Sequence, residues 1–363
     1  MNNKIIVAIV LIAVIASASV YAVYQEFYAT PPATQVTAQQ QNPSSQPTPS
    51  SQPPSSQPTP SSTTQTATSD KSSSSSSGTQ NTVNTPYYPL TVTDCEGTTV
   101  TIKSAPKRLV SLAPSITELV FAAGAGDLVV GVTDYCDYPY NFKAWIAAGN
   151  MTSIGNYWQP AVEPIMAVNP DLVFACGDGA SNDAAHKLRD LGYTVIVLNP
   201  TTVQEILNDI TLIGKVTERN SAAAATVSSL QTRINAITSK IADITDKPTV
   251  CYMMGTTYAA GSGCFISDLI TWAGGVNAFS DLEAAYPQVS REAVIARNPD
   301  IIITSGSTNT FLTNVNWSTI NAVINQRVYS VNNYNAYARN GPRFIDALED
   351  IASKIHPELF AAP

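Results

Sequence analysis

The sequence predicts an α/β fold with two Rossmann-like lobes, each containing a parallel sheet, joined by one long α-helix. Three observations support this prediction. Strand-like apolar runs alternate with helix-length segments, one short phrase occurs twice, and a long amphipathic segment separates the two copies. We also expect a transmembrane helix and a disordered linker to precede the lobes, because residues 1–86 differ sharply in composition from the rest of the chain.

The repeated phrase is the strongest of these signals. Glu163-Pro-Ile-Met-Ala-Val-Asn-Pro-Asp-Leu-Val-Phe is echoed by Glu292-Ala-Val-Ile-Ala-Arg-Asn-Pro-Asp-Ile-Ile-Ile, 129 residues later. Each copy indicates a short helix led by a carboxylate, a turn closed by Asn-Pro-Asp, and a buried strand. Two such copies predict two similar lobes with one acidic residue at an equivalent place in each. This arrangement suits gripping a ligand between the lobes, or docking both lobes onto a two-fold partner.

The remaining strands and helices follow the same order in both halves. We expect strands over 108–112, 129–133, 172–175 and 194–198 in the first half, and over 249–253 and 301–304 in the second. Helices over 115–123 and 267–273 are predicted to stop at Gly124 and at Gly274, because glycine readily takes the left-handed conformation that ends a helix.

The segment between the halves predicts the linking helix. Thr217 can cap a helix that runs to about Asp246, and the apolar residues along it step by three and four. These residues are Val227, Leu230, Ile234, Ile237, Ile241 and Ile244. We expect this stripe to pack on the protein's own lobes, with a coiled-coil partner as the alternative. The predicted division is an N-terminal lobe at 87–215, a linking helix at 216–246 that acts as a stiff hinge, and a C-terminal lobe at 247–363.

Residues 1–29 are predicted to form a membrane anchor or a signal peptide. The apolar run from Ile5 to Val23 has 19 residues, which as a helix spans about 28 Å. Lys4 before the run and Glu26 after it place the amino terminus in the cytoplasm and the rest outside. A cleaved signal peptide ending near Ala22 is the alternative, and it leads to the same extracytoplasmic location.

Residues 30–86 are predicted to be a disordered tether. They consist mainly of Ser, Thr, Pro and Gln, which cannot bury enough apolar surface to offset the entropy lost on ordering. This composition is also typical of an O-glycosylated stalk. In the lobes, Asn150 and Asn316 begin N-glycosylation sequons.

Composition also argues against several classes of function. A net charge of −8 with no basic stripe disfavours a nucleic-acid partner, and two histidines poorly supply a His-built metal or haem site. No G-x-S-x-G elbow is present, and Gly124-Ala-Gly126 ends a helix instead of opening one, so we do not expect an enzyme. One or two disulfides are possible, although small buried residues are the favoured interpretation of the five cysteines. These are Cys95, Cys136, Cys176, Cys251 and Cys264.

From about Leu90 to Phe360 the chain resembles the helix-linked class (class III) of ABC-importer substrate-binding proteins, which serve vitamin B12, iron-siderophore and haem uptake. Lys107-Arg-Leu-Val-Ser-Leu-Ala-Pro-Ser-Ile-Thr-Glu118 matches the opening strand, turn and helix of that class, and the two Asn-Pro-Asp phrases match its lobe signatures. The resemblance implies an extracytoplasmic binding protein, tethered to the outer face of the cell membrane. It implies a small-molecule ligand and, as partner, an ABC permease dimer with its ATPase subunits. We expect a monomer.

Within the class, two phrases look most like the vitamin B12-binding members. The segment from Gly131 to Pro139 matches their Gly-Val-x-x-Tyr-x-Asp-Tyr-Pro, and Tyr286-Pro-Gln-Val-Ser-Arg-Glu292 matches their Trp-Pro-Gln-Val-Ser-Arg-Glu. The chain departs from those members at Tyr286 and at Cys176, where they carry tryptophan. The resemblance implies cobalamin or a related corrinoid as ligand. It also assigns permease docking to Glu163 and Glu292, with an ordinary first-turn helix acid as the alternative for each.

The ligand site is expected outside the carboxyl ends of the strands, where open α/β sheets bind their ligands. The loops that follow these ends are rich in aromatic residues, which can cover the face of a corrin disc while polar groups bond its amide fringe. The predicted ligand residues are Tyr135, Tyr138, Trp158, Cys176, Tyr258, Tyr286, Tyr337 and Arg339.

Three rival functions stay open from the sequence. An iron-siderophore protein of the same class would need cations against an anionic chelate, and only Arg339, Arg343 and Arg291 are candidates. Haem binding would depend on a tyrosine ligand such as Tyr135. An adhesive surface protein on a stalk is the third alternative, but it would not need two matched acids or a tyrosine-lined site.

Overall fold

The structure is a computed structural model that describes residues 87–360. The predicted anchor and the predicted tether lie outside the described residues. Within 87–360, no helix combines the length and the hydropathy needed to cross a membrane.

The N-terminal lobe is a parallel sheet in the order β5-β4-β3-β6-β7, preceded by the antiparallel hairpin β1-β2. Its strands are β1 (Leu90–Thr93), β2 (Thr99–Ile102), β3 (Leu109–Ser111), β4 (Val129–Val132), β5 (Thr152–Ser153), β6 (Leu172–Cys176) and β7 (Val195–Leu198). Its helices are α2 (Pro114–Ala122), η1 (Gly126–Leu128), α3 (Phe142–Ala147), α4 (Val162–Ala167), α5 (Asn182–Asp190) and α6 (Val203–Val216).

The C-terminal lobe has parallel strands in the order β10-β8-β11-β12, with β9 antiparallel to β8. Its strands are β8 (Thr249–Met254), β9 (Tyr258–Ala259), β10 (Val276–Asn277), β11 (Ile301–Thr304) and β12 (Val328–Ser330). Its helices are α8 (Phe265–Trp272), α9 (Arg291–Arg297), α10 (Asn309–Leu312), η2 (Val315–Trp317), α11 (Asn321–Ile324), α12 (Tyr334–Ala338), α13 (Phe344–Ile355) and α14 (Pro357–Phe360). The predicted α/β fold with two parallel sheets is confirmed.

Alternate side chains of the central strands enter different cores. In β6, Leu172 and Phe174 join a large apolar cluster, while Val173 enters a separate one beneath α4 and α5. In β11, Ile301 and Ile303 join the same large cluster, and Ile302 enters a third. The large cluster therefore runs without interruption from the N-terminal sheet through α2, α6, α7, α8 and α13 to the C-terminal sheet.

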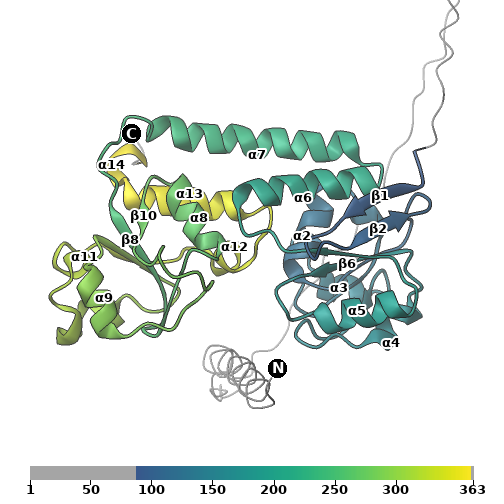
Figure 1. Cartoon of the computed structure of the whole chain (residues 1–363), viewed down its shortest axis with the longest axis horizontal. Coiled ribbons are helices and arrows are strands. Elements are labelled where there is room, and N and C mark those ends of the chain that lie inside the picture. The colour runs from purple at the N-terminus through teal and green to yellow at the C-terminus, as the bar shows by residue number, and fades with distance from the viewer. Residues whose placement is uncertain (1–86, 361–363) are drawn as a thin grey trace, which may run out of the picture. The chain divides into compact units, whose positions relative to one another are not determined.

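The linking helix α7 (Asn220–Lys240) lies along both lobes, as Figure 1 shows. Near its start the Thr226 hydroxyl donates to the Ala122 carbonyl oxygen of α2 at 2.7 Å. Farther along, the Arg233 guanidinium donates to Asp346 and Glu349 of α13 at 2.7 to 3.0 Å. Buried Leu230, Ile234 and Ile237 place the predicted apolar stripe against the protein's own core.

The predicted start and end of the linking helix were wrong. Thr217 is the carboxyl cap of α6, and its hydroxyl donates to the Ile213 carbonyl oxygen at 2.6 Å. Glu218 then adopts a left-handed φ of 57°, which breaks the helical path before α7 begins. The helix ends at Lys240, before the predicted limit at Asp246.

The repeated phrase forms the same turn in each lobe. Asn169 and Asn298 both have a φ of 45°, a left-handed conformation that asparagine tolerates better than most residues. Two residues later, the Asp171 carboxylate accepts the backbone N–H groups of Lys107 and Arg108 at 2.8 and 3.0 Å. The Asp300 carboxylate likewise accepts the backbone N–H of Thr249 at 2.9 Å. Each aspartate thus fixes the start of the neighbouring strand, β3 or β8.

The two predicted stop glycines are also equivalent. Gly124 and Gly274 both have a φ of 80°, and each follows the first long helix of its lobe, α2 or α8. A Cβ on Gly124 would lie 2.5 Å from the Cβ of Ala222 in α7. A Cβ on Gly274 would lie 3.1 Å from the Cδ1 of Ile241, just beyond the end of α7. Glycine therefore allows both lobes to approach the linking helix closely.

Candidate functional site

The predicted ligand residues fall into three groups near the carboxyl ends of parallel strands. Tyr135 and Tyr138 follow β4, and Trp158 and Cys176 lie near the end of β6. The C-terminal lobe supplies Tyr258 from β9, Tyr286 from the segment before α9, Tyr337 from α12 and Arg339 directly after α12. Tyr135, Tyr138, Trp158 and Tyr286 keep 36 to 42% of their surface exposed, which leaves their rings accessible.

The first group lies in the N-terminal lobe. The Tyr157 hydroxyl donates to the Asp178 carboxylate, and the rings of Tyr157 and Trp158 lie 4.9 Å apart. Burial raises the pKa of Asp178 above its ordinary value. The neighbouring Cys176 side chain is buried, and burial also raises the pKa of its thiol. Cys176 is therefore a neutral thiol at neutral pH.

The second group lies in the C-terminal lobe. The Tyr286 ring is partly exposed, but its hydroxyl end is enclosed, and burial raises the pKa of that hydroxyl well above its ordinary value. The Cys264 thiol contributes to this rise, and it donates a hydrogen bond to the Gly261 carbonyl oxygen at 3.3 Å. Backbone pairing of half-buried Tyr258 with Gln288 holds β9 beside the Tyr286 segment.

Tyr337 belongs to the core in this conformation. Only 1% of its surface is exposed, its ring stacks on Tyr252 with centroids 5.9 Å apart, and its hydroxyl donates to Asp350 at 2.7 Å. Its ring is therefore not accessible to a ligand, in contrast to the exposed rings of the other groups.

The third group joins the two lobes, and we call Glu118, Asp137, Arg339 and Arg343 the lobe junction. The Glu118 carboxylate of α2 accepts Nη1–H of Arg339 at 2.9 Å, and Nε–H and Nη2–H of Arg343 at 2.9 and 2.6 Å. Arg339 also donates to Asp137 and to the Tyr135 carbonyl oxygen. The Arg343 guanidinium lies over the Tyr138 ring, 4.4 Å from its centroid.

The lobe junction changes the interpretation of Arg339. Burial lowers the pKa of Arg339, but the carboxylates of Asp137 and Glu118 outweigh this effect and raise it overall. Arg339 is therefore a charged group whose partners are already in place. Sequence reasoning missed Glu118 as a site residue, because its partners lie 221 and 225 residues away.

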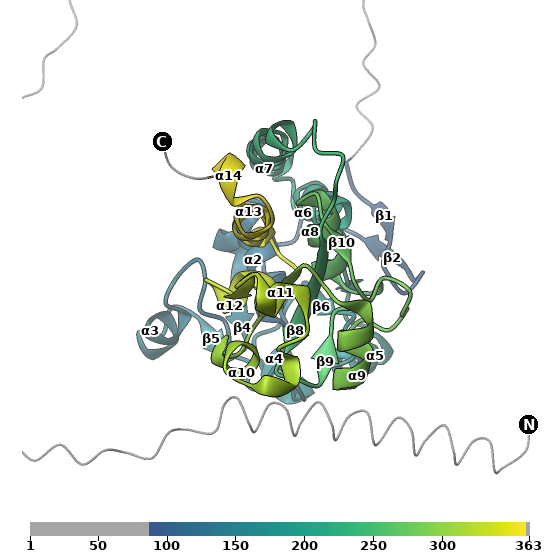
Figure 2. The same cartoon turned by 90° about the vertical axis from the view of Figure 1, so that its left-hand side faces the viewer.

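The two predicted docking acids are exposed residues in the first turns of α4 and α9. Figures 1 and 2 place both helices on the side of the lobes away from α7. Glu163 makes no ion pair with any residue in the described range, whereas Glu292 accepts from the Arg291 guanidinium at 2.8 Å. A backbone hydrogen bond and Arg291 lower the pKa of Glu292.

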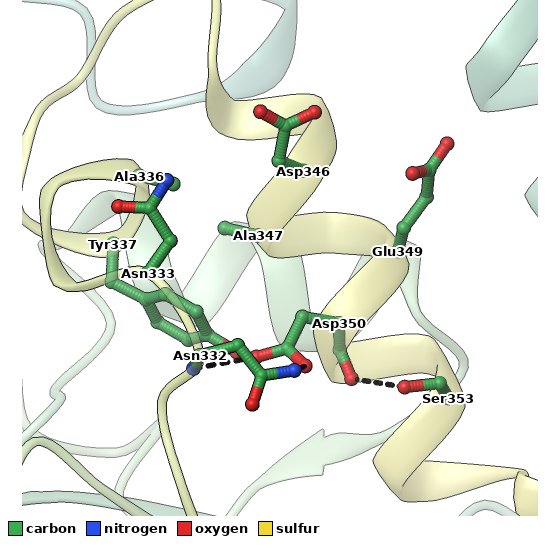
Figure 3. A pocket seen from close by; sticks show the side chains of 9 residues that line it. All are labelled: Asn332, Asn333, Ala336, Tyr337, Asp346, Ala347, Glu349, Asp350 and Ser353. Atoms are coloured by element: carbon green, nitrogen blue, oxygen red, sulfur yellow. Dashed lines mark hydrogen bonds between the residues drawn. The ribbon is translucent and has the colours of Figure 1, made fainter.

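Two hollows in the described part lie away from these groups. One, of about 340 Å³, lies between α12 and α13 around Asp350 (Figure 3). Its acids are already engaged, because Asp350 accepts from Asn332, Tyr337 and Lys354. The other, of about 530 Å³, runs between α6 and α7 and is lined mainly by small and polar side chains. Apart from the buried Tyr337, no predicted ligand residue lines either hollow.

All five cysteines are free thiols. Four of them are buried, which confirms the interpretation as small core residues, and Cys95 is exposed. Between residues 87 and 360, no group of three His, Cys, Asp or Glu side chains is arranged to hold a metal ion.

Comparison with known proteins identifies the family. Residues 109–334 match the model of a family described as periplasmic binding protein. The chain is 32% identical over 286 residues to an uncharacterized ABC transporter substrate-binding lipoprotein, YvrC, of Bacillus subtilis, covering 76% of this chain and 88% of that protein. It is 30% identical over 281 residues to a cobalamin-binding protein of Halobacterium salinarum, covering 74% of each.

Solved structures agree with this fold. The periplasmic vitamin B12-binding protein BtuF of Vibrio cholerae superposes with a TM-score of 0.60 at 27% identity, covering 71% of this chain and 99% of that one. Structures described as a possible iron-binding protein of Staphylococcus epidermidis and as a haem-binding protein of Roseiflexus also share the fold. The chain therefore belongs to the periplasmic binding protein family, as an extracytoplasmic, non-enzymatic substrate-binding protein of an ABC importer.

Proposed function

We propose that this protein captures a corrinoid between its two lobes and delivers it to an ABC permease. The observation that carries the proposal is the set of accessible aromatic rings near the carboxyl ends of the strands in both lobes. A corrin is a broad and mostly apolar disc, so aromatic faces from two sides suit it better than a polar site does. The 30% identity to a protein named as cobalamin-binding supports the same ligand class.

The ligand residues in this proposal are those predicted from the sequence, with different roles. Tyr135, Tyr138 and Trp158 offer exposed rings from the N-terminal lobe, and Tyr258 and Tyr286 offer rings from the C-terminal lobe. Cys176, Tyr337 and Arg339 are more deeply buried, and we assign them to the support of these rings.

An iron-siderophore or haem ligand is the alternative within the family. The arginine at the predicted site is paired with acids, which leaves an anionic chelate without a free cation there. Both histidines have partners outside the set of predicted ligand residues: His186 pairs with Glu96 at 3.0 Å, and His356 lies buried against Gly274. Both observations favour a corrinoid.

Calorimetric and spectroscopic titration with cyanocobalamin is the deciding experiment. We expect a 1:1 complex with a dissociation constant below about 10 μM. Trp158→Ala should weaken it about tenfold, because a stacked ring is lost, whereas Leu191→Ala, at an exposed apolar residue near the end of α5, should not. No heat and no spectral change at about 10 μM would remove the corrinoid and leave the family assignment intact. Haem and a ferric siderophore serve as parallel titrants.

Docking through Glu163 and Glu292 is the second part of the proposal. Both acids are exposed on the same side of the lobes, where arginines of two permease subunits can reach them. Joint replacement by lysine should abolish ligand-dependent stimulation of ATP hydrolysis in the reconstituted importer and leave cyanocobalamin affinity unchanged. Stimulation that survives would make these residues ordinary first-turn helix acids.

The amino-terminal region completes the proposal. We propose that residues 1–29 anchor the protein in the membrane and that residues 30–86 tether the lobes to this anchor, as their composition predicts. Full-length protein should fractionate with membranes, and protein that begins at residue 80 should not.

A further inference from the structure

The Glu118 carboxylate is fully enclosed between the two lobes. None of its side-chain surface is exposed, although a carboxylate loses much hydration when it is buried and almost never occurs so without partners. Three N–H groups of Arg339 and Arg343 replace the lost water, at 2.6 to 2.9 Å. Both arginines come from the C-terminal lobe, so this acid holds charges that belong to the opposite side of the predicted ligand site.

The charges of the lobe junction cancel. Arg339 and Arg343 contribute two positive charges, and Glu118 and Asp137 contribute two negative ones. Residues 135–139 and 332–343, which carry half of the predicted ligand residues, contain no other lysine or arginine. Nearby Asp134 and Asp178 are hydrogen-bonded by the neutral hydroxyls of Ser153 and Tyr157, which add no positive charge.

The arginines that Glu118 holds also position two of the predicted ligand rings. Arg339 Nη2–H donates to the Tyr135 carbonyl oxygen at 3.3 Å, and Arg343 lies against the face of the Tyr138 ring. Both guanidinium groups are nearly buried, with 14 and 11% of their side chains exposed, while Tyr135 and Tyr138 remain accessible. A ligand would therefore meet the tyrosines first, with the paired arginines behind them.

We infer that Glu118 is a specificity residue that makes the site select an uncharged ligand over an anionic chelate. By engaging both arginines inside the protein, it removes the two cations that would otherwise attract an anion. This inference depends on one part of the proposed function, namely that the ligand binds beside Tyr135 and Tyr138.

The test compares charge variants with two probes, cyanocobalamin and iron(III) citrate. Wild-type protein should not bind iron(III) citrate. Glu118→Gln frees positive charge and should raise affinity for the anion at least about tenfold, with the gain falling as salt is added. Glu118→Gln combined with Arg343→Gln restores neutrality and should cancel the gain. Asp137→Asn frees part of the Arg339 charge at a half-exposed acid and should give a smaller gain of the same sign.

Circular dichroism melting establishes which variants are folded. If Glu118→Gln does not fold, Asp137→Asn decides the matter. The Asp137 side chain is 52% exposed, so removing its charge does not leave a buried group without its partner. Folded variants with no gain in anion affinity would overturn the inference, as would wild-type binding of iron(III) citrate. Failure of cyanocobalamin to bind, with the anion gain observed, would overturn the corrinoid proposal and leave the role of Glu118 standing.

Discussion

In the N-terminal lobe the repeated phrase presents Glu163 without an ion pair to any described residue, whereas in the C-terminal lobe Arg291 lies 2.8 Å from Glu292. The turn that follows the helix of each acid is the same, because both asparagines have a φ of 45° and both aspartates hold the neighbouring strand. The comparison separates two functions of one motif. The Asn-Pro-Asp part builds the lobe, and the glutamate is presented on a surface that differs between lobes. Four sets of substitutions test how far the two lobes are equivalent.

Loss of the strand-holding aspartates should have the largest effect. Asp171→Ala and Asp300→Ala should each lower the free energy of unfolding by about 2–4 kcal/mol, because each leaves backbone N–H groups without a charged acceptor. Chemical denaturation measures the loss. Asp183→Ala, at an exposed acid in the first turn of α5, is the control and should cost less than about 0.5 kcal/mol. Costs equal to this control would refute the structural role of the phrase.

The stop glycines should give the next largest effect, and an unequal one. Gly124→Ala should cost about 2–3 kcal/mol, because the new Cβ would lie only 2.5 Å from the Cβ of Ala222, and this clash adds to the left-handed backbone strain. Gly274→Ala should cost less, since its nearest neighbour is the His356 side chain at 2.9 Å. Gly192→Ala, at a φ of 87° with open space around it, measures the backbone strain alone, about 1 kcal/mol. Equal melting temperatures for the three variants would contradict the crowding against α7.

The docking acids should differ by a smaller amount. Glu163→Gln should weaken binding to the permease about fivefold more than Glu292→Gln, because Glu292 must first give up its bond to Arg291. Affinity for the reconstituted importer, measured by surface plasmon resonance, checks this. Arg291→Ala should bring the contribution of Glu292 up to that of Glu163. A larger loss for Glu292→Gln would reverse the proposed ranking.

The smallest effect concerns a hydrogen bond that, among residues 87–360, is found only in the C-terminal lobe, in which the Thr249 hydroxyl donates to the Asp300 carboxylate at 2.7 Å. In the described part of the N-terminal lobe, the equivalent Asp171 carboxylate accepts from backbone N–H groups alone. Although burial raises the pKa of Asp300, the hydrogen bonds from Thr249 and Asn321, together with the charge of Arg327, outweigh it and lower that pKa overall. Thr249→Val should therefore cost about 0.5–1 kcal/mol above pH 5. A depressed folded pKa stabilises only above the unfolded value near 3.9, so the cost should shrink as acid protonates Asp300. A cost that stays constant down to pH 2 would contradict this linkage.

Local signals in the sequence predicted most of the scaffold. The strand over 301–304 is observed at those residues, and the other predicted strands agree within a residue or two, because apolar runs bounded by Asn-Pro-Asp or glycine leave little choice of conformation. The helix stop at Gly124 was predictable because glycine readily takes the left-handed conformation that ends a helix. The break at Glu218 was not predicted, and the contacts beside it are non-local, because the next residue, Arg219, donates to Gly124 and Asp127 more than ninety residues away.

The candidate site was predictable only in outline. Strand ends and aromatic loops indicated Tyr135, Tyr138, Trp158 and Tyr286, which the structure leaves accessible. Tyr337 was grouped with them because it lies in one of the aromatic-rich segments that follow the strand ends. In the short helix α12, however, Tyr334 remains exposed while Tyr337 turns into the core toward Asp350. The lobe junction escaped notice because charge pairs between distant segments leave no periodic pattern in a sequence.

The uninterrupted apolar cluster that runs from one sheet to the other through α7 has a consequence for transport. Two lobes that share one hydrophobic core should move little relative to each other when the ligand binds. Under the proposed docking, the ligand-free protein therefore offers the importer the same pair of acids as the ligand-bound protein. Unloaded copies would then occupy the entrance in competition with loaded ones. Uptake should rise with the amount of carrier, reach a maximum, and fall once vacant carriers outnumber those with cargo.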